Sequence, residues 1–130
     1  MSHSSLEHIN ITVSDPEATA KLLCELFDWH ERWRGEAIYG GRSIHIGSET
    51  DYIAVYTRGA SGSPGGRSYD TTGGLNHVGV VVQDLEAVEA RVKQAGLLPH
   101  SHADYEPGRR FYFNDRDGIE YEVVSYTSAE

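Results

Sequence analysis

The fold is decided by a stretch that occurs twice in the chain, as LEHINITVSD at residues 6–15 and as LNHVGVVVQD at residues 75–84. At a constant offset of 69 residues, the identical pairs are Leu6/Leu75, His8/His77, Val13/Val82, Asp15/Asp84, Glu17/Glu86 and Ala18/Ala87. Ile9/Val78 and Ile11/Val80 are conservative pairs. Because an internal repeat is typical of duplicated supersecondary units, we expect two copies of one module.

Each copy is expected to open with a strand and continue into a helix. Alternating apolar residues predict strands over residues 7–13 and 76–82. Ser14 and Glu17 fit a capping box, with Pro16 in the first helical turn. The predicted core positions of this first helix are Ala18, Leu22, Leu23 and Leu26. The second helix is expected to begin at Asp84, to bury Leu85, Val88, Val92 and Ala95, and to stop at Gly96.

Three shorter strands follow in each module. They are expected at residues 29–34, 43–46 and 52–57, and at residues 97–100, 110–114 and 120–126. Residues 115–118 read as the hairpin turn between the last two strands. The predicted fold is α+β, with two βαβββ modules in one domain of residues 1–130. Module one covers residues 6–58, a glycine-rich linker covers 59–74, and module two covers 75–127.

Composition narrows the functional classes. The chain has 130 residues and a formal net charge of −9, which disfavours nucleic acid or an anionic membrane as a partner. Cys24 is the single cysteine, so an intrachain disulfide is impossible and a reducing compartment is expected. No apolar run approaches the length of a membrane helix, and the N-terminus does not look like a signal peptide. We therefore expect a cytoplasmic protein.

Strand alternation places several chemically active side chains on one sheet face. If Ile9, Phe111 and Tyr121 belong to the core, the residues of opposite parity share the other face. That face collects His8, His45, His77, Tyr112, Glu120 and Glu122. Two neutral imidazoles and one carboxylate, here His8, His77 and Glu122, form a donor set for a divalent ion that leaves coordination positions open. Arg110 has the same parity and is read either as an anion-binding or as a surface residue.

These motifs, together with FYFNDRDGIEYEVV at residues 111–124, resemble the vicinal oxygen chelate superfamily. The superfamily includes glyoxalase I, bleomycin-resistance proteins, extradiol dioxygenases and fosfomycin-resistance enzymes. The resemblance implies a U-shaped mixed-sheet cavity around a divalent ion (Fe, Mn, Zn or Ni) with His8, His77 and Glu122 as ligands. Ala54 is placed at the position equivalent to Glu122, so the chain departs from the four-ligand glyoxalase pattern.

The resemblance implies a metal-dependent enzyme that acts on a small oxygenated substrate, as a dioxygenase or as a glyoxalase-like lyase. His45, Tyr112 and Glu120 are the candidate catalytic residues. A metal-free binding protein of the bleomycin-resistance type and a thiol transferase of the fosfomycin-resistance type are the alternatives. The segment 100–109 lacks the lysine expected of the transferases. A homodimer, with or without exchanged modules, is the expected assembly.

Overall fold

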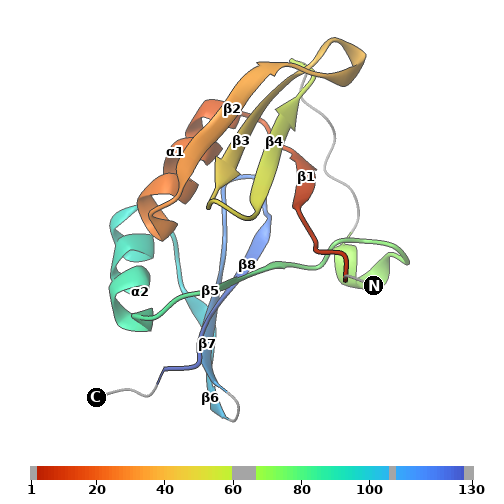
Figure 1. Ribbon diagram of the computed structural model, residues 1–130. Helices are drawn as coiled ribbons and strands as arrows, with labels where there is room; N and C mark the ends of the chain where they lie inside the picture. The colour runs from red at the N-terminus through yellow and green to blue at the C-terminus, as the bar shows by residue number, and fades with distance from the viewer. Residues whose placement is uncertain (1–2, 60–66, 106–107, 128–130) are drawn as a thin grey trace. The chain divides into compact units, whose positions relative to one another are not determined.

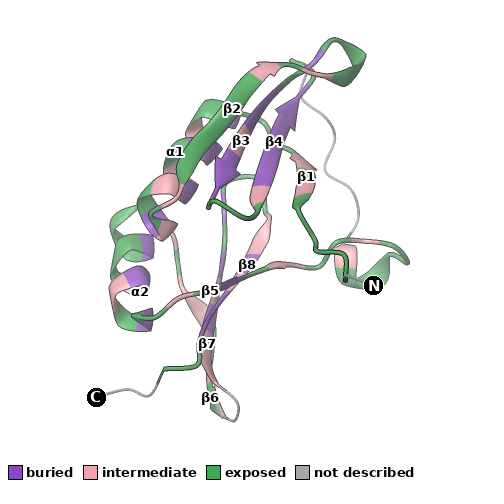
Figure 2. Cartoon of the chain, in the orientation of Figure 1, coloured by how far each residue is buried: buried purple, intermediate pink, exposed green. Residues whose placement is uncertain are grey.

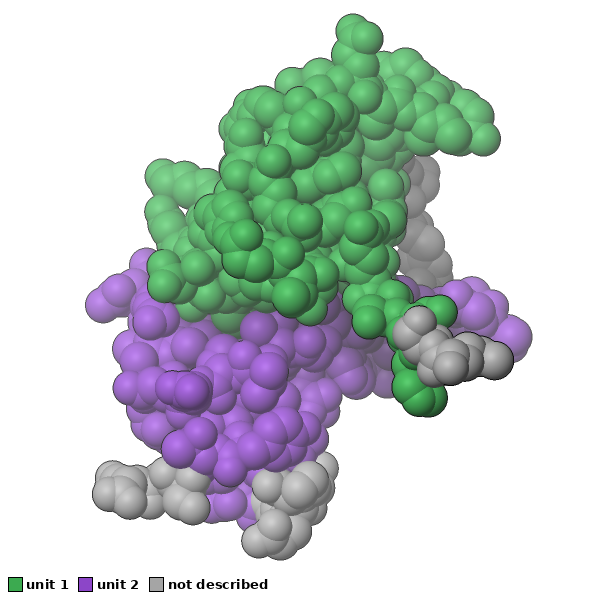
Figure 3. All heavy atoms as spheres, in the orientation of Figure 1, with its two compact units in different colours: residues 1–62 green, residues 63–130 purple. Residues whose placement is uncertain are grey.

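A computed structural model describes residues 3–59, 67–105 and 108–127. The chain divides into two compact units, residues 1–62 and residues 63–130, which are coloured separately in Figure 3. Among the described residues, no helix is long and apolar enough to cross a membrane.

The first unit follows the predicted order of strand, helix and three strands (Figure 1). Its elements are β1 (His8–Thr12), α1 (Pro16–Phe27), β2 (His30–Glu36), the short 3-10 helix η1 (Ile38–Gly40), β3 (Arg42–Gly47) and β4 (Tyr52–Thr57). They form a four-stranded sheet in the order β1-β4-β3-β2. β1 runs parallel to β4, and the other neighbours are antiparallel.

The second unit repeats this topology. Its elements are the short 3-10 helix η2 (Ser68–Asp70), β5 (Val78–Val81), α2 (Leu85–Gln94), β6 (His100–Tyr105), β7 (Gly108–Asn114) and β8 (Glu120–Ser125). The sheet order is β5-β8-β7-β6, again with the first strand parallel to the last. The predicted α+β fold of two βαβββ modules is therefore confirmed.

Each sheet buries one face against its own helix, which explains the two alternating sequence patterns (Figure 2). In the first unit, the buried side chains include Leu23, Leu26, Ile44, Ile46, Ile53 and Val55. In the second unit, they include Leu85, Val88, Val92, Phe111, Phe113, Tyr121 and Val123. Each large apolar side chain buried in this way stabilises the fold by about 1.5–3 kcal/mol. The opposite sheet faces carry polar and aromatic side chains such as His45, Tyr112 and Glu122, beside smaller apolar ones such as Ala54 and Val124.

The register of the two sheets equates Ala54 with Glu122. In β1 and β4, Asn10 pairs with Ala54, whereas in β5 and β8, Gly79 pairs with Glu122. Asn10 lies two residues after His8 and Gly79 lies two residues after His77, so the pairs correspond. The same register pairs His45 with Ala54 and Tyr112 with Glu122.

Both helices begin at an aspartate, which corrects one sequence prediction. Asp15, rather than Ser14, is the N-cap of α1, and its Oδ1 accepts a hydrogen bond of 3.2 Å from the amide of Ala18. Asp84 caps α2 in the same way, through the amide of Ala87 at 3.0 Å. The capping aspartate and its helical first turn are therefore part of the repeat.

Three further details differ from the prediction. Thr19 and Ala20 are buried in α1, whereas Ala18 and Leu22 are only partly buried, because the helix turns a slightly different stripe toward the sheet. Ala95 is the exposed C-cap of α2, which ends before Gly96 with its φ of 84°. The strand expected over residues 97–100 instead covers His100–Tyr105, with an irregular register against β7. Residues 60–66 of the predicted linker lie outside the described residues.

Candidate functional site

In the second unit, polar side chains gather around His77, which precedes β5 by one residue. Its Nε2 atom lies 3.0 Å from Oε1 of Glu122, on the neighbouring strand β8. Its Nδ1 atom lies 3.2 Å from the hydroxyl of Tyr69 and 3.4 Å from Oε2 of Glu120. The carboxylates of Glu120 and Glu122 are largely buried, while the His77 side chain is one-third exposed. The structure therefore brings three of the predicted site residues, His77, Glu120 and Glu122, together.

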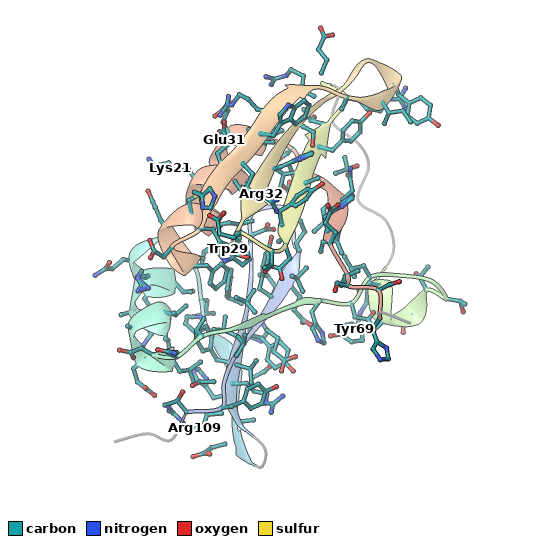
Figure 4. All side chains as sticks on the ribbon, in the orientation of Figure 1. Lys21, Trp29, Glu31, Arg32, Tyr69 and Arg109 are labelled. Carbon is teal, nitrogen blue, oxygen red and sulfur yellow. The ribbon has the colours of Figure 1, made fainter. Side chains whose placement is uncertain are left out.

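Tyr69 connects the first two of these residues. It belongs to η2, which lies within the predicted linker (Figure 4). Its hydroxyl donates a short hydrogen bond to Glu120, and this bond is the main reason why the pKa of Tyr69 rises to about 12. Because the single hydroxyl proton is used on Glu120, the Tyr69 oxygen is left to accept from Nδ1 of His77. In a neutral His77 ring, the proton would therefore lie on Nδ1, and the Nε2 lone pair would face Glu122.

The other oxygen of Glu122 is also engaged. Nη1 of Arg110, on the adjacent strand β7, donates to Oε2 of Glu122 at 2.8 Å. Such a charge-assisted bond fixes the carboxylate plane. Oε1 therefore remains directed at His77. Neither the His77 ring nor the Glu122 carboxylate can rotate without losing one of its contacts.

Tyr112 and His100 extend the same sheet face. The Tyr112 ring meets the His77 ring edge-on, at a centroid distance of 5.7 Å, and stacks on His100 at 6.1 Å. Nε2 of His100 lies 2.8 Å from Oδ1 of Asn114. Tyr112, a predicted catalytic residue, thus contacts a predicted metal ligand, as strand parity requires.

In the first unit, the equivalent face carries a row of stacked rings. His8 stacks on Tyr52 with a centroid distance of 4.8 Å, and Tyr52 stacks on His45 at 4.5 Å. His45 in turn contacts Trp33 on β2 at 4.9 Å. Glu7 accepts at 2.7 Å from Nδ1 of His8 if that nitrogen is protonated, which directs Nε2 away from Glu7. This unit therefore places His8 and His45 on one face, with Tyr52 between them.

His45 is suited to accept a proton. Desolvation by burial lowers the pKa of His45, electrostatic interactions with His8 and Arg32 lower it further, and the interaction with Glu7 opposes them. The ring is therefore neutral near pH 7, as a general base must be. In the sequence, His45 was a candidate base only because of the sheet face it shares. The surroundings of its ring now give an electrostatic reason why it could accept a proton.

The predicted metal ligands come from both units. His8 belongs to the first unit, whereas His77 and Glu122 belong to the second. Over residues 3–59, 67–105 and 108–127, no three histidine, cysteine, aspartate or glutamate side chains converge as the ligands of a metal ion. What the second unit supplies by itself is a pair of donor atoms, Nε2 of His77 and Oε1 of Glu122.

Sequence reasoning missed Tyr69 and the partner of Arg110. Tyr69 lies outside the strands and helices that the sequence patterns predict. The only feature that could have pointed to it is that it is an aromatic residue in a glycine-rich segment shortly before His77. Arg110 was placed on the correct face by parity. Its partner Glu122 follows only from the β7–β8 register, in which the two residues lie diagonally across the strands.

Two βαβββ units with histidine at the start of each and a glutamate on the last strand of the second define a vicinal oxygen chelate protein. In agreement, the family model of the Glyoxalase/Bleomycin resistance protein/Dioxygenase superfamily matches residues 5–123. The chain belongs to this superfamily. No match was found among curated proteins.

Solved structures share the fold at low sequence identity. A glyoxylase/bleomycin resistance protein/dioxygenase domain from Frankia sp. EAN1pec matches with a TM-score of 0.81 and 22% identity, covering 99% of this chain and 96% of that one. The fosfomycin resistance protein FosX from Listeria monocytogenes, in complex with Mn(II) and sulfate, matches with a TM-score of 0.73 and 21% identity, covering 95% and 93%. FosX from Mesorhizobium loti matches with a TM-score of 0.70 and 23% identity, covering 98% and 95%.

Proposed function

We propose that this chain is a divalent-metal-dependent enzyme in which His8, His77 and Glu122 bind the ion. Its substrate is a small molecule whose oxygens occupy the remaining coordination positions. The reaction is of the dioxygenase or glyoxalase-like lyase type. Three protein ligands leave the open positions that a catalytic site requires, in contrast to a closed structural site.

The observation that carries the proposal is the 3.0 Å approach of Nε2 of His77 to Oε1 of Glu122. Tyr69 occupies the opposite nitrogen of His77, and Arg110 occupies the other oxygen of Glu122. In the neutral ring, the two facing atoms both present lone pairs. Such a pair is stable only with a cation between them, either a proton or a metal ion.

The distance fits a metal ion. Two ligand atoms that each lie about 2.1 Å from one ion, at right angles, are about 3 Å apart. Nitrogen plus carboxylate oxygen is also the mixed donor set that Mn(II), Fe(II) and Zn(II) accept. Mn(II) is the first ion to test, because the related fold of Listeria FosX was solved with it.

The protein residues have distinct roles in this proposal. Tyr69 and Glu120 hold the His77 tautomer, and Arg110 orients Glu122, as groups behind metal ligands commonly do. When bound, the ion supplies Lewis-acid stabilisation of negative charge that develops on substrate oxygens. His45 accepts the substrate proton, and Tyr112 contacts the substrate beside His77. Glu120, predicted to be catalytic, becomes a positioning residue because Tyr69 engages it.

Metal analysis and turnover together test this function. The purified protein is expected to contain one divalent ion per chain, and the triple variant His8→Ala/His77→Ala/Glu122→Ala is expected to contain none. Oxygen uptake with a panel of catechols, and isomerisation of hemithioacetals, then assign the reaction. Thiol consumption with an epoxide would assign the transferase alternative instead. A folded wild-type protein that binds no divalent ion would contradict the proposal and favour the metal-free binding protein.

We further propose a homodimer, and subunit mixing tests whether its modules are exchanged. His8→Ala and Glu122→Gln each damage one ligand, but on different modules. If sites form across two chains, a mixed dimer regains one intact site and about half of the bound metal. If each site forms within one chain, mixing restores nothing. A monomer in light scattering would contradict the dimer itself.

A further inference from the structure

A β-bulge in β2 changes the direction of one side chain. Glu31 pairs with Ile46 and Trp33 pairs with His45, so Arg32 is an extra residue in β2 with no partner in β3. Such an extra residue interrupts the alternation of side chains and re-aims its neighbours. Glu31 and Arg34 lie on the helix side, where Arg34 binds both Glu31 and Glu17 of α1. Arg32 and Trp33 are both left on the opposite side, the face of His45.

The Trp33 ring packs over Gly35, which has no Cβ atom to displace it. A Cβ atom at Gly35 would approach the Trp33 ring to 2.7 Å, so any other residue would displace the indole. The ring contacts His45 on one side and is still 48% exposed. An exposed tryptophan held beside other rings offers a planar surface for stacking.

Arg32 covers the next ring of the same row. Its guanidinium carbon lies 4.6 Å from the centroid of the Tyr52 ring. Within the described residues, no carboxylate forms an ion pair with Arg32, whereas Arg34 on the same strand has two such partners. The nearby carboxylate of Glu7 is bound to His8 and to the Tyr52 hydroxyl instead. Figure 4 labels Glu31 and Arg32 on β2. The bulge therefore presents a guanidinium, without a carboxylate partner, beside stacked rings.

We propose that Arg32, Trp33, His45 and Tyr52 form the subsite for a planar anionic substrate, such as an aryl or enol carboxylate. The inference rests on the proposed function, because it names the substrate class of that site. Arg32 binds the anionic group through its planar fork of N–H donors, and the exposed Trp33 ring stacks on the flat part of the molecule. Because His8 stacks on Tyr52, a molecule bound here lies on the same sheet face as His8, which is a proposed metal ligand.

Binding of benzoate tests the subsite without turnover. Benzoate is titrated into the metal-free full chain and into the Mn(II)-loaded chain, with the NMR signals of His45 and Trp33 as the readout. Benzamide serves as the neutral probe of the same shape, and cyclohexanecarboxylate as the non-planar anion. We expect benzoate to bind the wild-type chain more tightly than either of them.

Arg32→Gln is expected to weaken benzoate binding by about tenfold or more, since it removes a hydrogen bond between charged groups. Benzamide binding should not change. Arg42→Gln is the matched control, because Arg42 carries the same charge on β3 but has the parity of the helix-facing residues. Arg32 is exposed, so its replacement should leave the melting temperature unchanged.

Equal benzoate affinity in Arg32→Gln and wild type would overturn the inference, and so would a wild-type chain that binds no benzoate. Equal affinity for cyclohexanecarboxylate would overturn the planar part of it. A chain that binds no metal but binds benzoate through Arg32 would contradict the proposed function while supporting the subsite. A chain that binds metal but not benzoate would contradict the subsite while leaving the proposed function supported.

Discussion

The hydroxyl of Tyr69 lies 3.2 Å from Nδ1 of His77, although Tyr69 belongs to the segment that joins the two repeated modules. The segment thus contacts a proposed metal ligand in addition to connecting the modules. Since the same hydroxyl donates to Glu120, the contact selects one tautomer of His77.

Replacement of Tyr69 by Phe tests this contact. Tyr69→Phe removes the acceptor that holds the Nδ1 proton, so Nε2 is no longer fixed as the donor atom toward Glu122. We expect the affinity for Mn(II), measured by calorimetric titration of the metal-stripped chain, to fall by about tenfold or more. Tyr39→Phe is the matched control, because Tyr39 lies exposed in η1 of the other unit. Unchanged Mn(II) affinity in Tyr69→Phe would remove Tyr69 from the site.

The titration of His45 provides a second test. Burial, followed by the charges of His8 and Arg32, lowers the pKa of His45, so NMR of its ring protons should give a midpoint below the usual value of about 6.5. Arg32→Gln removes one of these charges and should move the midpoint upward. A midpoint at or above 6.5 in the wild-type chain would contradict the neutral base.

The lowered pKa of His45 also affects stability. The unfolded chain binds the His45 proton more readily than the folded chain does. The contribution of His45 is therefore complete above about pH 6.5 and is lost as the pH falls from there toward the folded-state pKa. In His45→Asn, denaturant unfolding should show a weaker dependence on pH in this window; an identical dependence would contradict the assignment.

Asp115 is expected to stabilise the hairpin between β7 and β8. Its buried Oδ1 accepts from the amides of Asp117 at 2.9 Å and Ile119 at 3.0 Å. Asp115→Ala leaves both amides without this acceptor and should lower the free energy of unfolding by about 1–3 kcal/mol. Asp115→Asn keeps an acceptor oxygen and removes a carboxylate whose pKa is raised by burial, so its loss should be smaller. Equal losses in urea unfolding of the two variants would contradict this explanation.

The repeat made much of the fold predictable from the sequence. Strand alternation separated Phe111, Phe113 and Tyr121 from Tyr112 and Glu122, because a strand with one buried face must alternate. The residue-by-residue match between the two copies also aligned His8 with His77. Ala54 was equated with Glu122 from the family resemblance rather than from the constant offset of 69 residues, and the β1–β4 and β5–β8 registers agree.

The parts that could not be predicted depend on local irregularity. The bulge at Arg32 and the shifted start of β6 change register by a residue or two, and no period in the sequence marks such a shift. Tyr69 belongs to the short 3-10 helix η2, which no sequence pattern marked, and only the folded backbone decides which side chains it meets. Contacts of this kind follow from tertiary structure rather than from pattern.

Titration of the metal-stripped chain with Mn(II) tests the central claim most directly. The wild-type chain is expected to bind one ion per chain, and His8→Ala, His77→Ala and Glu122→Ala should each lose most of that affinity. His30→Ala, at the exposed start of β2, removes a histidine from the first unit as a control and should bind like the wild type. Undiminished binding in His8→Ala would show that the first repeat supplies no ligand, and would contradict the shared site.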